Sequence, residues 1–281
     1  KWDLRVRVPE GFLVHASGTP RGSSRSGSAR IFRFTQHPND FRPFILTGRY
    51  HEQRIRAHDV AVHFWSFQPL PSDRLAPISS RFASTAATLQ SIFGPVAKGS
   101  LTVWFVEASP PASPHSPGTP VAPFPAGALL PAAFFREELG QPLALELSEA
   151  LLADTWIAQI AKPQLGPYRF VESALLHHAL WAARERRGEP LDTQALALWA
   201  LRDSNKTRLF ALALRETCGE EPLNRALLRM IQSRRGLDWT VDDLRSALEL
   251  ESGQNLAEFF RVWLYQPGIP EDFRRRYMRA P

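Results

Sequence analysis

The carboxylate and imidazole side chains of one helical region are the groups in this sequence best suited to chemistry. Asp154 lies inside an apolar helical stretch, and Glu172 opens the next one, with His177 and His178 a little further on. Such groups can bind a metal ion or transfer protons. Adjacent helical residues point about 100° apart, so both histidines cannot face one metal, and we expect them to serve helix packing. For Asp154 we expect a satisfied buried carboxylate, and for Glu172 a salt bridge with Arg169 or another arginine.

Other chemically capable residues lack a recognisable arrangement. His51-Glu52 and His58-Asp59 occur in strand-and-loop sequence without His-Glu-x-x-His spacing, and we expect them at the surface. The single Cys218 excludes an internal disulfide and a metal site built only from cysteines. The sequence has no Gly-x-Ser-x-Gly nucleophile motif and no glycine-rich phosphate loop. A familiar hydrolase or nucleotide site is therefore not predicted.

The composition is that of an ordinary globular protein. The 281 residues are 44% hydrophobic and 22% charged, enough for one large domain or two smaller ones. No apolar run reaches the roughly 20 residues of a membrane-spanning helix. The net charge is +6, but the arginines are scattered and no nucleic-acid motif accompanies them. We expect a solvated basic surface and no specific nucleic-acid partner; binding of nucleic acid or anionic lipid stays open as a third hypothesis.

Strand-like alternation dominates the first 70 residues. Leu4, Val6 and Val8 alternate with arginines, and Val60–Phe67 alternates again. Because the chain opens on a strand, with neither a signal peptide nor a start methionine, we expect a piece of a longer protein. Ser17–Ala29, rich in Gly, Ser and Arg, is predicted to form a long hairpin loop.

The rest of the chain has mainly the helical period. A helix is predicted over Ile78–Phe93 and a strand over Leu101–Val106, whereas 7 prolines in 17 residues predict an irregular loop over Ser109–Pro125. Gly236 is predicted to end a helix, and Thr240 to start another with a capping box. Further helices are predicted over Leu145–Ile160, Val171–Arg186, Thr193–Leu201, Lys206–Thr217, Glu221–Ser233, Val241–Leu248 and Leu256–Trp263. Strands followed by helices are typical of an α+β fold.

Several stretches, in this order, resemble the aminopeptidase N family of gluzincin zinc metallopeptidases. Asp3–Gly18 resembles the end of the family's N-terminal β-domain, and Phe44–Tyr50 the strand that leaves it. Thr85–Val106 resembles the helix and strand that enter the thermolysin-like catalytic domain. Asn255–Asp272 is similar to the closing helix and its WL-x-x-PG-x-P turn. The resemblance covers nearly the whole chain.

The family binds zinc through His-Glu-x-x-His on a helix and a later glutamate. Residues four apart share one helical face, so two imidazoles reach one metal while the Glu between them is the general base. The matching helix here is Leu147–Trp156, and the resemblance implies that Trp156 sets the register. The histidine positions then hold Ala150 and Asp154, and the general-base position holds Leu151.

A second register places Ser148 and Leu152 at the histidine positions and Glu149 at the general base. In the first register, Glu172 corresponds to the later zinc ligand, although the spacing from Asp154 is one residue shorter than the family's. Neither register supplies a histidine, and one or two carboxylates make a poor zinc site.

Two other parts of the family's site also differ. The GxMEN strand, which binds the substrate's backbone and its free amine, corresponds to Gly127–Pro131, an expected edge strand with Leu130 in place of the amine-binding Glu. The transition-state tyrosine corresponds to Ser204, close before Lys206. We therefore expect the metal site, the general base and the amine anchor to be lost together.

The sequence thus predicts an α+β fold: the end of a β-sandwich-like N-terminal domain at residues 1–70, then a thermolysin-like, mainly helical domain at residues 71–281. The favoured function is a catalytically inactive aminopeptidase-like module, of bacterial origin, that is structural or binds an unknown protein or peptide, without cofactor. The alternative is an active zinc metallo-aminopeptidase, or another hydrolase, with ligands not recognised in the sequence; only then is zinc expected. An extracytoplasmic or membrane-tethered location is favoured.

Overall fold

The chain divides into two compact units. The computed structural model describes residues 2–36, 44–95, 101–108, 122–124, 127–130, 132, 134–138, 141–160, 162–163, 168–234 and 238–278. Unit 1 comprises residues 1–56, 61–79 and 102–145, and unit 2 comprises residues 57–60, 80–101 and 146–281. Helices α1 (Ser72–Phe93) and α2 (Pro142–Ile160) each contribute residues to both units.

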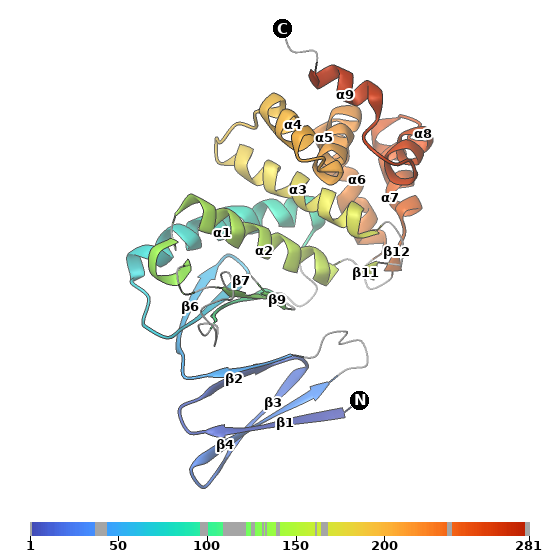
Figure 1. Cartoon of the computed structure of the whole chain (residues 1–281). Coiled ribbons are helices and arrows are strands. Elements are labelled where there is room, and N and C mark those ends of the chain that lie inside the picture. Colours follow the sequence, from blue (N-terminus) through green and yellow to red (C-terminus); the bar gives the residue numbers. More distant parts are fainter. Residues whose placement is uncertain are drawn as a thin grey trace. The chain divides into compact units, whose positions relative to one another are not determined.

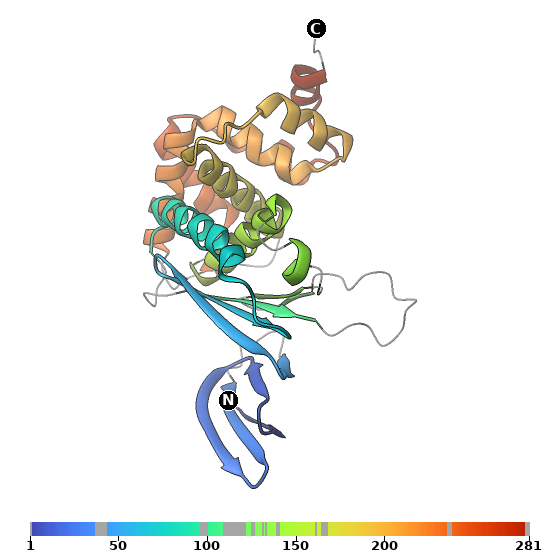
Figure 2. The same ribbon diagram turned by 90° about the vertical axis from the view of Figure 1, so that its left-hand side faces the viewer.

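Unit 1 begins with a three-stranded antiparallel sheet in the order β1-β4-β3 (Figures 1 and 2). Its strands are β1 (Trp2–Pro9), β3 (Thr19–Ser26) and β4 (Ala29–Gln36). The predicted loop over Ser17–Ala29 is wrong, because β3 pairs with β4 from Thr19 to Ser26. Every residue of β3 is exposed, so the strand is formed by main-chain pairing and carries no hydrophobic alternation that could reveal it in the sequence.

Two further sheets complete the strands of unit 1. β2 (Leu13–Ala16) pairs with β5 (Ile45–Gly48). A five-stranded sheet has the order β6-β7-β8-β10-β9. Its strands are β6 (His51–Ala57), β7 (Val60–Ser66), β8 (Leu101–Glu107), β9 (Ala122–Phe124) and β10 (Gly127–Leu130). β9 lies within the predicted loop Ser109–Pro125, of which residues 109–121 and 125 are outside the described residues.

Unit 2 is built from helices that pack around apolar side chains such as Phe210 and Leu227. Its complete helices are α3 (Tyr168–Arg186), α4 (Thr193–Arg202), α5 (Lys206–Cys218), α6 (Glu220–Ser233), α7 (Val241–Ser252), α8 (Ala257–Phe260) and α9 (Glu271–Met278). The short strands β11 (Lys162–Pro163) and β12 (Asp238–Trp239) pair in parallel. These helices confirm the predicted order and the α+β class, while the division at residue 70 stays a prediction.

Two predicted helix boundaries need correction. α1 begins at Ser72, six residues before the predicted start, and it includes Pro77, which reads in the sequence as a boundary. The predicted helix Leu256–Trp263 is α8 followed by a π-helical turn, η2 (Arg261–Tyr265). A similar turn, η1 (Phe134–Glu138), lies in unit 1. Irregular turns of this kind leave no periodic signal.

The predicted capping box at the start of α7 is confirmed. Thr240 Oγ1 accepts a hydrogen bond from the Asp243 backbone N–H at 3.1 Å, and the Thr240 N–H donates to Asp243 Oδ2 at 2.8 Å. This reciprocal pair is the predicted capping box and it starts α7. The predicted helix end at Gly236 lies outside the described residues. No helix in the described ranges is both long and apolar enough to cross a membrane.

Candidate functional site

The middle of α2 has an open face and a buried face. Ala150 and Leu151 are half-buried and Asp154 is exposed, whereas Leu152 and Trp156 are buried. Spacings of three and four residues place the first group on one side of the helix. The first register therefore puts both histidine positions and the general-base position on the open face of α2. A site that takes up metal and substrate needs such a face.

The expectation of a buried, satisfied Asp154 is wrong, because its side chain is exposed. No other described residue forms a hydrogen bond or ion pair with this carboxylate. Nearby protein atoms still displace part of its water, and this loss of hydration raises the pKa of Asp154 above the usual aspartate value. Among its apolar neighbours in the sequence, Leu152, Ala153 and Trp156 are buried.

The second register falls on the buried face of α2. Glu149 Oε1 lies 2.7 Å from Arg187 Nη1 and accepts a hydrogen bond from Thr85 Oγ1 at 2.6 Å, and Glu149 Oε2 lies 3.1 Å from Arg81 Nη1. Glu189 completes the cluster at 2.9 Å from Arg187 Nε, a hydrogen bond that lowers the pKa of Glu189. The Glu149 carboxylate is buried and enclosed by two guanidinium groups and a hydroxyl, so it is not accessible to a substrate and does not suit a general base.

The residues of either register do not fit the zinc site that the resemblance implies. Ala150 and Leu151 carry no donor side chain, which leaves Asp154 on α2 and Glu172 on α3 as the potential ligands of the first register, without an imidazole. In the second register, Ser148 and Leu152 are both fully buried. The sequence contains no His-Glu-x-x-His. In the described part of the chain, no group of three or more His, Cys, Asp or Glu side chains could hold a metal ion.

Glu172 and Ser204 both belong to unit 2. Glu172 is half-buried on α3. Ser204 is an exposed residue of the turn between α4 and α5, with a φ of 51°, and its carbonyl accepts a hydrogen bond from the Lys206 N–H at 2.9 Å. The short side chain of this turn residue cannot replace a phenol that stabilises a transition state.

The two adjacent histidines serve helix packing, as predicted. His178 is buried, and its Nε2 lies 2.8 Å from Asn224 Oδ1. The His177 ring stacks on Trp181 with a centroid separation of 5.9 Å. Burial lowers the pKa of each histidine to about 4, so both are neutral near pH 7.

Leu130 lies in unit 1, in a strand that has neighbours on both sides. β10 pairs in parallel with β8 and antiparallel with β9, so the predicted edge strand is wrong. The Leu130 side chain is fully buried. On the β10 side of the described sheet the outer strand is β9, which reads Ala122-Pro123-Phe124, and β6 is the outer strand on the opposite side. The many prolines around β9 concealed this strand, because proline predicts loops.

Glu107, across the strand pair from Leu130, is a buried carboxylate that the sequence analysis missed. Its Oε2 accepts a hydrogen bond from the Phe67 N–H at 2.7 Å, and its Oε1 lies 3.6 Å from Arg136 Nη2. Burial, followed by the charge of Glu107, raises the pKa of Tyr50. The signal available in the sequence was a lone carboxylate ending an apolar strand.

The other histidine and carboxylate pairs do not form a site. His51 and His58 are exposed, as predicted, while Glu52 lies 2.8 Å from His63 Nδ1 and 3.1 Å from Arg54 Nη2. These contacts join residues of the β6–β7 hairpin. They serve sheet structure and do not bring together a set of metal ligands.

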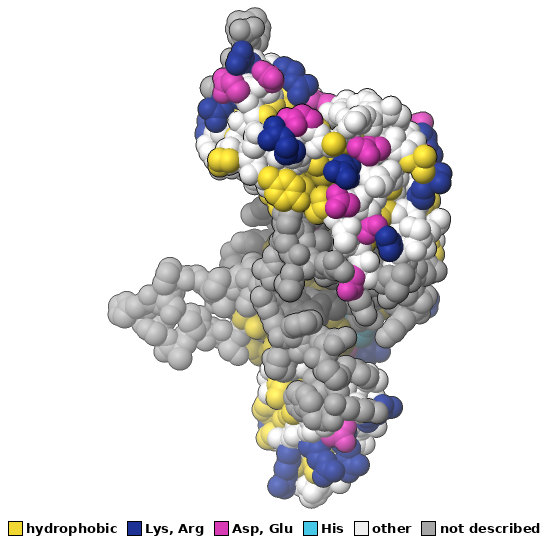
Figure 3. Space-filling model, turned by 90° about the vertical axis from the view of Figure 1, so that its right-hand side faces the viewer, with side chains coloured by type: hydrophobic (Ala, Val, Ile, Leu, Met, Phe, Trp, Pro, Cys, Tyr) yellow, Lys and Arg dark blue, Asp and Glu magenta, His cyan; other side chains and the backbone are white. Residues whose placement is uncertain are grey.

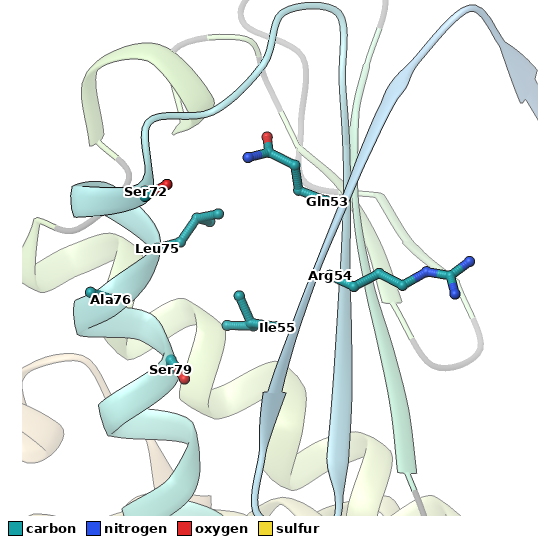
Figure 4. Close-up of a pocket in the computed structure, with 7 residues that line it drawn as sticks. All are labelled: Gln53, Arg54, Ile55, Ser72, Leu75, Ala76 and Ser79. Carbon is teal, nitrogen blue, oxygen red and sulfur yellow. The ribbon is translucent and has the colours of Figure 1, made fainter.

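A surface pocket of about 360 Å³ lies in unit 1 between β6 and the first turns of α1 (Figure 4). Gln53 and Ile55 point toward α1, and Arg54 points away from it. The lining residues are Gln53, Arg54, Ile55, Ser72, Leu75, Ala76 and Ser79. No imidazole or carboxylate is among them, so this pocket offers neither a metal site nor a general base.

Comparisons with known proteins identify the fold. No family model matches the chain, and no curated protein matches it in sequence. The M1 zinc metallopeptidase from Deinococcus radiodurans is similar in structure, with a TM-score of 0.69 and 16% identity over 95% of this chain and 64% of that one. A two-domain M1 zinc metallopeptidase mutant bound to L-arginine gives 0.67 and 18%, again over 95% and 64%.

Aminopeptidase A from Legionella pneumophila, in complex with aspartic acid, gives a TM-score of 0.64 and 13% identity, over 95% of this chain and 34% of that one. The chain therefore spans less than two thirds of the length of these similar proteins. At such low identity the similarity establishes the fold: a mixed α+β architecture like that of M1 zinc aminopeptidases.

Proposed function

We propose that this chain is a non-catalytic module that keeps an M1-aminopeptidase-like fold and serves a structural role or binds a protein or peptide. The observation that carries the proposal is the open face of α2. That face presents Ala150, Leu151 and Asp154 where a zinc peptidase needs two imidazoles and a carboxylate base. The side chains required for the chemistry are missing at the accessible positions.

The strands that would hold a peptide's free amine support the same proposal. β10 reads Gly-Ala-Leu-Leu and β9 reads Ala-Pro-Phe, so neither supplies a carboxylate. A peptide can add its backbone only to an outer strand, and Pro123 of β9 has no N–H to donate. An α-ammonium group would find no charge partner on these strands.

The test combines metal loading with a search for cleavage. The purified 281-residue chain is dialysed against zinc, freed of excess metal and incubated with peptides that have a free N-terminus; mass spectrometry then follows their length. A known zinc aminopeptidase treated in the same way is the positive control. We expect intact peptides and no tightly held zinc.

The rival class of function is an enzyme, and the same experiment separates the two. Removal of N-terminal residues that a zinc chelator abolishes would overturn the proposal in favour of a metallo-aminopeptidase. Cleavage that survives the chelator would favour a hydrolase with other residues, among which the buried Glu107 and the exposed Asp154 are the carboxylates to replace first.

A further inference from the structure

Unit 1 carries an unusual pairing of like charges. In the antiparallel pair β1 and β4, Arg5 lies directly opposite Arg33, and Asp3 lies opposite Thr35. Alternate residues of a strand share a face, so these four side chains stand on the same side of the sheet. Both arginines are exposed. Figure 3 shows basic side chains gathered over the β1–β4 part of the face that it presents.

A third arginine joins the pair from β3. Arg21 Nε donates a hydrogen bond to Thr35 Oγ1 at 3.0 Å, and the Thr35 hydroxyl donates to Asp3 Oδ1 at 3.2 Å. Because Thr35 is buried, its hydrogen bond holds the Arg21 guanidinium group in place at the pocket. Asp3, Arg5, Arg21, Arg33, Phe34 and Thr35 line one pocket of about 260 Å³.

The charges of this pocket are not balanced within the described residues. Arg5, Arg21 and Arg33 have no ion-pair partner there, whereas Arg25 on the same hairpin lies 2.6 Å from Glu10. Three guanidinium groups face one carboxylate, Asp3. Like charges directly opposite each other on paired strands destabilise a sheet. An anion in the pocket would remove that repulsion.

We propose that this pocket binds a phosphate-type oxyanion. Guanidinium groups present planar pairs of donors that match phosphate oxygens, and three of them around one pocket suit a tetrahedral anion with several acceptor oxygens. A water molecule takes about 30 Å³ of liquid, so the pocket has room for the anion and some of its waters. Asp3 on the wall disfavours a long polyanion, whose neighbouring phosphates it would repel. The site does not depend on whether the module is catalytic.

The first test uses inorganic phosphate and the full chain. Calorimetric titration at low ionic strength, with chloride at matched ionic strength as the blank, measures the affinity. We expect phosphate to bind and Arg33→Gln to weaken binding about tenfold or more, because one charged hydrogen bond is lost. Arg33→Lys keeps the charge but not the planar donors, and we expect an intermediate loss.

Arg25→Gln is the matched control: it removes the same charge from the same hairpin at a residue outside the pocket lining. We expect it to leave phosphate binding unchanged. In the absence of phosphate, Arg33→Gln should raise the unfolding temperature at low salt, because the repulsion between the charges of Arg5 and Arg33 disappears. Binding absent at millimolar phosphate, or weakened equally by Arg25→Gln and Arg33→Gln, would overturn the proposal.

Two further arms identify the source of the phosphate group. Glycerol 3-phosphate represents a soluble phosphomonoester, and vesicles containing phosphatidic acid represent a lipid headgroup. If both depend on Arg33, the site recognises the phosphate group itself. Binding of vesicles that is unaffected by Arg33→Gln reflects the general positive charge and counts against the site.

Discussion

Arg187 Nη1 lies 2.7 Å from Glu149 Oε1 on the buried face of α2. This ion pair, together with the contacts from Thr85 and Arg81, holds the same carboxylate in the interior of unit 2. The two possible registers of a zinc-peptidase helix therefore differ in accessibility, because the register that uses Glu149 is buried. The positions that remain accessible are Ala150, Leu151 and Asp154, and the predictions below follow from that division.

Glu149→Gln should destabilise the protein by about 3 kcal/mol, because it removes the buried carboxylate between Arg81 and Arg187 and leaves these guanidinium groups with the half-buried Glu189 as their ion-pair partner. Chemical denaturation measures the loss. Glu146→Gln is the control: its side chain is more than half exposed and 3.8 Å from Arg184, so we expect a change below about 1 kcal/mol. Equal losses in both variants would refute the structural role of the Glu149 cluster.

Leu152→Ala should cost about 3 kcal/mol, since a fully buried leucine leaves a cavity. Leu151→Ala, the same change one residue earlier on the open face, should cost about 1 kcal/mol or less because Leu151 is only half-buried. The difference between the two losses of stability shows which face of α2 is buried. A larger loss at Leu151 would reverse the assignment of the faces.

Building a metal site should succeed in one register only. Ala150→His with Leu151→Glu and Asp154→His places the zinc motif on the open face, and we expect a folded protein that gains zinc affinity. Ser148→His with Leu152→His, which keeps Glu149 between them, forces two imidazoles into the buried face and should unfold the protein. Circular dichroism and zinc titration compare the two. Zinc binding by the second variant alone would contradict the assigned register.

Stability should fall as the pH drops from about 6.5 toward 4. An unfolded histidine takes up a proton near pH 6.5, whereas burial lowers the pKa of His178 to about 4 in the folded chain. Between these values the unfolded state binds more protons than the folded state. His178 alone therefore lowers the free energy of unfolding by about 3 kcal/mol by pH 4, and it causes no further loss at lower pH. Denaturation at pH 7 and pH 4.5 measures the effect.

His178→Gln, which keeps a polar group beside Asn224, should lose part of this pH dependence, and His51→Gln, at an exposed position, should retain it. The half-buried His177 and His15, each with a pKa lowered to about 4 mainly by loss of hydration, add to the total loss. An unchanged pH dependence in the His178 variant would show that other groups control acid stability.

The sequence predicts regular elements well where one periodic pattern sets them. The α5, α6 and α7 helices have an apolar period, and Thr240 caps α7 as expected. β3 and β9 were missed because exposed or proline-rich residues conceal strands that depend on pairing with a distant segment.

The candidate site could be predicted from the sequence less completely than the fold. In the sequence, Trp156 favours the register with Asp154 and leaves the register with Glu149 as an alternative, but apolar residues surround the helix, so the sequence does not show which side of α2 is buried. Arg81 and Arg187, which decide the matter for Glu149, lie 68 and 38 residues away from it. Such contacts follow from tertiary packing and have no spacing signal.

The most direct test of the central claim is the zinc content of the chain after dialysis against zinc and removal of free metal, measured together with the turnover of an aminopeptidase substrate. The missing donors at Ala150 and Leu151 predict no stoichiometric zinc and no turnover. Zinc retained at one ion per chain, with turnover that requires it, would contradict the account.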